Sequence, residues 1–276
     1  MTLVYAGTCS HAPGITSRAE MAAPEIRNQL HDAFARQRQA LIDTGTEALV
    51  MVSSEHFANF FMDNMPTFSI GMANIYEGPI EDPEWLKINR TQIPANPDLS
   101  VRLINEVMQT VDVGYAQEWQ FDHGMSVPLH FLTPNYDLPI VPVNINCQNP
   151  PLSPLHRSWA LGKALRRAID FAPERIALMG TGGTSHWPCT PDSGRINEQW
   201  DEILLDQLIH KHKDALLAHT DEETFLEAGP GAFEMRTSIC VAAATEDQTG
   251  EVWFAQAIPN YATTCSITTL YMAESV

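Results

Sequence analysis

The chain is poor in basic residues. It carries 16 Lys and Arg against 34 Asp and Glu, which gives a formal net charge of −18 and a pI near 4.8. Proteins that grip nucleic acids need clustered Lys and Arg to contact phosphates, so this balance argues against a nucleic-acid partner. The sequence also lacks a run of about 20 apolar residues that would span a bilayer, and its first residues lack the basic flank and apolar segment of a signal peptide. We therefore expect a cytoplasmic protein that binds a small molecule.

Cysteine is also scarce. The chain has five cysteines, an odd number, and none of them forms a CxxC pair. This pattern favours neither a disulfide framework nor a thiolate zinc site. We interpret the cysteines as small hydrophobic residues of the core. They are Cys9, Cys147, Cys189, Cys240 and Cys265.

Short apolar runs alternate along the chain with longer segments of helical period. Strands are predicted over residues 2–6, 48–53, 67–72, 139–145, 175–179, 252–258 and 266–271. Helices are predicted over residues 21–42, 99–111, 154–171, 196–212, 221–227 and 231–244. This alternation predicts a single α/β domain over residues 1–276, with a central mixed, largely parallel sheet flanked by helices on both faces. Residues 76–97 contain four prolines, Pro79, Pro83, Pro94 and Pro97, and are predicted to be a long loop that covers a site.

Three histidines follow predicted core strands. They are His11, His56 and His186. Because ligands of open sheets bind beyond the carboxyl ends of the strands, these side chains are expected to converge on one pocket. His123 lies in the turn-like segment Phe121-Asp122-His123-Gly124, ahead of an apolar run. A lone histidine is more often a hydrogen-bonded or surface residue, and we interpret the others in this way: His31, His130, His156, His210, His212 and His219.

Two histidines and one carboxylate form the donor set of many iron(II) oxygenases. Glu234 is a candidate carboxylate because it follows a glycine-containing bend and opens an apolar segment with helical spacing. At that position it can point into a cleft. A glutamate at a helix start also complements the helix dipole without any further role, so the residues alone leave both interpretations open.

Five segments resemble, in order, the class III extradiol ring-cleavage dioxygenases, a family that includes the catalytic subunit of protocatechuate 4,5-dioxygenase and the dihydroxyphenylpropionate dioxygenases. They are SHAPG at residues 10–14, EHF at 55–57, MPTFSIG at 65–71, DHG at 122–124 and GGTSH at 182–186. Residues 197–201 (NEQWD) and 233–235 (FEM) are also placed as in those enzymes.

The resemblance implies that His11, His56 and Glu234 hold Fe(2+), and that His123 and His186 act as acid and base. The substrates would be a dihydroxy-aromatic compound and O2. The product would be a ring-opened semialdehyde acid, or its aza or carboxylated counterpart. Family members usually assemble, some with a small helical accessory subunit that caps the substrate pocket, and we expect this chain to form a homo-oligomer. Relatives commonly carry Asp before the second iron ligand, whereas this chain has Glu55, which would alter any hydrogen bond that orients His56.

Two other functions stay open. A zinc-dependent hydrolase or lyase on the same scaffold would also use a His/His/Glu site. The other alternative is a non-catalytic binding protein, which would have no need of all five candidate residues: His11, His56, His123, His186 and Glu234. Arg18 and Arg236 are candidate partners for a substrate carboxylate, although each is more often a surface or structural charge. The GTGGTSH segment has neither the Walker lysine nor GxGxxG spacing, so we predict close backbone packing around a metal rather than nucleotide binding.

Overall fold

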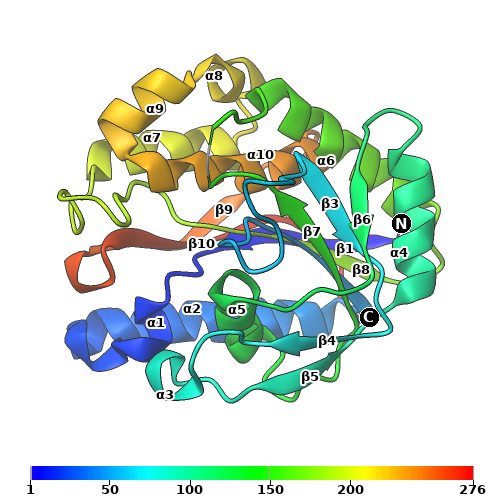
Figure 1. Ribbon diagram of the computed structural model, residues 1–276, viewed down its shortest axis with the longest axis horizontal. Coiled ribbons are helices and arrows are strands. Elements are labelled where there is room, and N and C mark those ends of the chain that lie inside the picture. The colour runs from blue at the N-terminus through cyan, green and yellow to red at the C-terminus, as the bar shows by residue number, and fades with distance from the viewer. Residues whose placement is uncertain (1, 149, 276) are drawn as a thin grey trace.

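The computed structural model describes residues 2–148 and 150–275. Its main sheet has eight strands in the order β6-β3-β7-β2-β8-β1-β10-β9 (Figure 1). The strands β7, β2, β8 and β1 run parallel to one another, while β3 is antiparallel to β7, and β10 is antiparallel to both β1 and β9. Their bounds are β1 (Leu3–Cys9), β2 (Ala48–Ser53), β3 (Phe68–Gly71), β6 (Gly114–Ala116), β7 (Ile140–Ile145), β8 (Ile176–Thr181), β9 (Glu251–Ile258) and β10 (Thr263–Met272).

Helices cover both faces of this sheet (Figure 1). One face carries α2 (Pro24–Asp43) and α5 (His123–Leu132), and the other carries α4 (Pro97–Val107), α6 (Leu155–Asp170), α7 (Glu198–Ile209) and α10 (Met235–Ala244). Shorter elements are α1 (Gly14–Ser17), α3 (Pro83–Leu86), α8 (Lys213–Ala218), α9 (Asp221–Ala228), η1 (Ala19–Met21), η2 (Pro230–Glu234) and η3 (Pro259–Tyr261). The predicted fold class is therefore confirmed.

The central strands β1, β2, β7 and β8 are apolar at most positions because both of their faces are buried. In β2, Val50 belongs to the core beneath α6 and α10, while Leu49 and Met51 belong to the core beneath α2 and α5. Successive side chains of a strand point to opposite faces, so a strand between two helical layers reads as a continuous apolar run. This pattern is the reason that residues 48–53 were predicted with the bounds that β2 has.

The prediction of a long loop over residues 76–97 is wrong. β4 (Ile75–Gly78) and β5 (Thr91–Pro94) pair as an antiparallel ribbon, and α3 lies between them. We call residues 75–94 the arm. Its prolines suggested irregular structure, but Pro83 stands at the start of α3 and Pro94 at the end of β5, where a missing N–H is tolerated.

The helix α5 was not predicted, since Gly124 and Pro128 weaken its helical signal. Asp122 compensates by capping the helix, accepting a hydrogen bond from the Gly124 N–H at 3.0 Å. All five cysteines are free. Within residues 2–148 and 150–275, no helix has both the length and the apolar character of a membrane span.

Candidate active site

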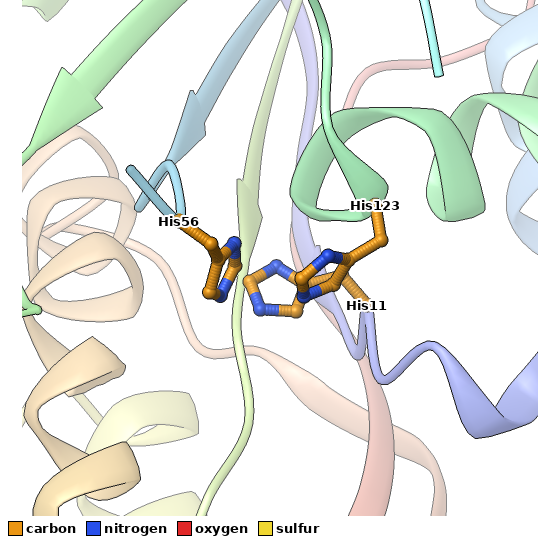
Figure 2. Close-up of side chains that lie close together, drawn as sticks. All are labelled: His11, His56 and His123. Carbon is orange, nitrogen blue, oxygen red and sulfur yellow. The ribbon is translucent and has the colours of Figure 1, made fainter. Parts of the chain in front are cut away.

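The predicted histidines converge at one edge of the sheet. The strands β2, β8 and β1 are parallel neighbours, and their ends are level, with Val52 beside Gly180 and Cys9 beside Thr181. His11, His56 and His186 follow these three strands in the sequence. The first residue of α5, His123, completes the group, and Figure 2 shows its imidazole facing those of His11 and His56.

Three of these imidazoles are close enough to share a metal ion. One ring nitrogen from each of His11, His56 and His123 lies within 4.8 Å of the other two. The rings of His56 and His123 stack with centroids 3.9 Å apart, whereas the ring of His11 meets that of His56 edge-on at 5.1 Å (Figure 2). Imidazole nitrogen is a common ligand of divalent transition metals. The cluster is therefore suited to binding such a metal.

Glu234 reaches the same cluster from the other helical layer. It ends η2 at the start of α10, and its side chain is 3% exposed. Its Oε1 lies 3.1 Å from His11 Nε2 and 3.2 Å from His56 Nε2. Its Oε2 accepts a hydrogen bond from the Gly183 N–H at 2.6 Å. The bend predicted before Glu234 thus turns the carboxylate into the site.

His186 lies at the border of the cluster. Its Nδ1 donates to the Thr184 carbonyl at 2.9 Å, so Nε2 is free and lies 4.0 Å from Glu234 Oε2. The ring fits because residue 231 is glycine, since a Cβ there would lie 2.2 Å from His186 Nε2. Gly183 also packs against this ring. Close packing against the His186 ring thus accounts for Gly183, which belongs to the GTGGTSH segment, and for Gly231.

Asp122 is a site residue that sequence reasoning missed. Its Oδ2 accepts hydrogen bonds from the backbone N–H of His56 at 2.6 Å and from His56 Nδ1 at 2.9 Å. Glu55 does not contact the His56 ring; its Oε2 accepts from the N–H groups of the turn that follows, at Ala58 and Asn59. The longer side chain of Glu55 reaches forward along the chain. The signals for its role were its position directly before His123 and its place in the DHG segment at residues 122–124.

Thr181 holds His11 in a comparable way. Its Oγ1 lies 3.1 Å from His11 Nδ1 and donates to the Gly124 carbonyl at 2.8 Å. That carbonyl is available because Pro128, four residues later in α5, has no N–H to donate to it. The proline that obscured α5 in the sequence thus leaves an acceptor for the residue that orients His11.

Glu81, in the arm, is the corresponding partner of His123, whose Nδ1 lies 2.7 Å from Glu81 Oε1. All four histidines therefore have Nδ1 bound to an outer partner, and Nε2 is the nitrogen left for chemistry. Outer partners of this kind fix the tautomer and ring direction of metal-binding and catalytic histidines.

Residues 5–271 match the family model described as the catalytic LigB subunit of aromatic ring-opening dioxygenase. The chain belongs to this family.

The similar proteins include two 2,3-dihydroxyphenylpropionate/2,3-dihydroxicinnamic acid 1,2-dioxygenases. The protein from Paraburkholderia xenovorans is 28% identical over 269 residues, covering 81% of this chain and 83% of the relative. The protein from Cupriavidus necator is 32% identical over 185 residues, covering 66% of this chain and 57% of the relative. A solved structure, uncharacterized protein JW3007 from Escherichia coli K12, has a TM-score of 0.67 at 17% identity and covers 97% of this chain and 100% of its own. That structure shows the same fold.

The electrostatics of this LigB-family site differ between its histidines. Burial lowers the pKa of His56, but the carboxylates of Asp122 and Glu234 outweigh burial and raise this pKa to about 10. Burial lowers the pKa of both His123 and His186, and the charge on His56 lowers them further. The pKa of Glu234 lies well below its usual range, because the charge of His11 outweighs the effect of burial. The two histidines whose pKa is lowered are neutral near pH 7 and can accept protons.

Neither arginine considered as a substrate partner is bound to the cluster. Arg236 is buried, and its guanidinium donates to the Asp221 carboxylate and to the Ser153 carbonyl, so it is a structural charge. Arg18 is exposed next to α1. Arg236 is therefore excluded as a partner of a substrate carboxylate, while Arg18 stays a predicted one.

Proposed function

We propose that this dioxygenase-family chain is a non-haem iron(II) enzyme that cleaves a vicinal dihydroxy-aromatic or heteroaromatic ring in the extradiol manner. The observation that carries the proposal is the position of Glu234 Oε1, within 3.2 Å of Nε2 of both His11 and His56. Two imidazoles and one carboxylate on one side of an ion are the donors that non-haem iron(II) oxygenases use. We therefore assign the iron to His11, His56 and Glu234.

The reaction class agrees with the names of the relatives, which are dioxygenases of dihydroxylated phenylpropionate and cinnamate. The proposed substrates are a catechol-like compound and O2, with both oxygen atoms incorporated into a ring-opened product. Iron(II), when bound, would supply Lewis acidity toward the substrate hydroxyls and a centre that reacts with dioxygen. The rest of the catalysis falls to the protein.

His186 is the proposed proton acceptor. Its Nδ1 is bound to the Thr184 carbonyl, which leaves the Nε2 lone pair to take a proton from a substrate hydroxyl. Burial lowers the pKa of His186, so the ring is neutral and ready to accept this proton near pH 7. His123 is the proposed second base or acid: its lowered pKa keeps Nε2 unprotonated, so His123 would first accept a proton there and then donate it. Both roles need only Nε2.

The three-imidazole cluster favours a second candidate. His11, His56 and His123 form a set of the kind that catalytic zinc uses, so the alternative is a zinc hydrolase or lyase in which His123 is a ligand. Two variants separate the ligand sets. With Glu234 as ligand, Glu234→Ala loses iron, while His123→Ala keeps it and loses about 10²- to 10⁴-fold in turnover. Loss of metal in His123→Ala but not in Glu234→Ala would establish the three-histidine site.

The activity is tested on protein reconstituted with iron(II) without air. An oxygen electrode and a panel of catechols should show oxygen uptake with one or more diols, and product mass after ¹⁸O2 should show two labelled atoms. Absence of oxygen uptake with every diol, together with hydrolysis by the zinc-loaded protein, would refute the proposal.

Homo-oligomeric assembly, a small accessory subunit and a cytoplasmic location stay predictions, which light scattering and cell fractionation would test.

A further inference from the structure

We propose that Glu81 is a positioning residue for His123, holding its ring in the tautomer and orientation that turn Nε2 toward the metal and substrate. This inference rests on the proposed role of His123 in the reaction. Glu81 itself is placed outside the reacting groups, and it acts only through the histidine.

The contacts of Glu81 are specific to this task. Its Oε1 accepts two hydrogen bonds from His123, one from the backbone N–H at 2.8 Å and one from Nδ1 at 2.7 Å. Accepting at Nδ1 requires the hydrogen to be on that nitrogen, so Nε2 carries the lone pair. The ring is also stacked on that of His56, with 30° between the planes. Its freedom to rotate is therefore restricted both at its edge and on its face.

Backbone hydrogen bonds between the arm and Phe121 position Glu81. The Phe121 N–H donates to the Glu77 carbonyl at 2.8 Å, and the Ile80 N–H donates to the Phe121 carbonyl at 2.8 Å. This register brings Glu81, the residue after Ile80, beside His123, two residues after Phe121. The site is thus completed by a segment that lies outside the main sheet.

A purely local role does not explain Glu81. The neighbouring Asp82 caps α3, accepting from the Glu84 N–H, so Glu81 is not needed for that turn. The second oxygen of Glu81, Oε2, is buried and has no hydrogen-bond partner among the described residues. A buried carboxylate oxygen without a partner costs free energy. Retaining a carboxylate here despite this cost is consistent with a role in the site.

Three variants test the assignment in the iron-loaded enzyme. Glu81→Ala removes the acceptor, whereas Glu81→Gln keeps an oxygen that can accept from both N–H groups of His123. Glu77→Gln, with its side chain exposed on the same arm, makes the same change of charge and serves as the control. We expect Glu81→Ala to lower kcat by about 10- to 100-fold, with KM for the diol and iron content changed by less than about twofold. Glu81→Gln should lose less, and Glu77→Gln nothing.

A spectroscopic measurement tests the same assignment without relying on catalysis. Nitrogen-15 NMR of histidine-labelled, zinc-loaded protein, assigned with His123→Ala, should show the Nδ1–H tautomer of His123 in the wild type and in Glu81→Gln, and a mixture in Glu81→Ala. If Glu81→Ala fails to fold, Glu81→Met replaces it. Wild-type kcat together with an unchanged tautomer in the variant without an acceptor would overturn the role of Glu81. If the wild-type protein opens no aromatic ring, the proposed function fails. The role of Glu81 is then decided by the NMR measurement of the His123 tautomer alone.

Discussion

Besides Glu234, two carboxylates stand close to His56: Glu55 precedes it in the sequence, and Asp122 lies beside it in space. The structure assigns different tasks to Glu55 and Asp122. Asp122 Oδ2 accepts from both the backbone N–H and Nδ1 of His56, while Asp122 Oδ1 accepts from the Gly124 N–H. In Asp122→Asn, one of the two carboxylate oxygens is replaced by an NH2 group, so only one acceptor oxygen remains. The amide must therefore turn its NH2 group either toward His56 or toward Gly124, so that one set of N–H donors loses its acceptor.

The expected losses follow from these contacts. A hydrogen bond to a buried charged group contributes roughly 1.5 to 3 kcal/mol, and a buried donor left unpaired costs a similar amount. Loss of the acceptor for one set of N–H donors should destabilise the metal-free protein by roughly 2 to 3 kcal/mol. For a domain of this size, this lowers the Tm by about 4 to 12 °C. Because Asp122 orients His56, iron(II) affinity should also fall about 10- to 100-fold.

Glu55→Gln provides the matched comparison. It also exchanges a carboxylate for an amide next to His56, yet Glu55 bonds to the turn at Ala58 and Asn59, and Gln can keep that acceptor. Burial raises the pKa of Glu55, so a neutral side chain is tolerated there. Iron affinity, measured by chelator competition without oxygen, should stay within about threefold of wild type. Equal losses in the two variants, or an Asp122→Asn protein that binds iron normally, would show that Asp122 does not orient the ligand.

Two further predictions concern other parts of the chain. Gly231→Ala places a Cβ 2.2 Å from His186 Nε2, so the imidazole ring must move. We expect kcat to fall by about 10²-fold or more while iron content is retained. An unchanged kcat would contradict the role of His186. Burial lowers the pKa of Lys211 to about 8, so the folded protein binds this proton less tightly than the unfolded chain, whose lysine pKa is about 10.4. Lys211 therefore destabilises the fold below pH 8, and this effect fades as the pH rises to about 10.4. Lys211→Met should raise the Tm at pH 7 and much less at pH 10.5; a gain that is equal at both values would show that the charge is not responsible.

Most of the fold was predictable because its sheet is buried on both faces. Continuous apolar runs such as residues 48–53 have one interpretation when turn signals flank them, and the predicted bounds agree with β2. The arm and α5 were not predicted. Their prolines and glycines weaken local propensity, and their stability comes from contacts that the sequence does not display: the pairing of the arm with the segment before Asp122, and the cap that Asp122 supplies.

The sequence by itself determined which residues reach the site from the central strands. His11 and His56 follow parallel strands, and strand ends of one sheet meet at one edge whatever the loops do. Glu234 depended on the family resemblance, because a glutamate at a helix start has an ordinary structural explanation.

Only the tertiary structure decided how each histidine is held. Thr181, Asp122, Glu81 and the Thr184 carbonyl bind the four Nδ1 atoms. Apart from Thr184, they come from positions in the chain far from the histidines that they orient. A side-chain hydrogen bond needs two atoms about 3 Å apart, and no local pattern encodes that distance between distant segments. The sequence therefore indicated which residues gather at the site, and the packing of strand ends, α5 and the arm specified their orientation.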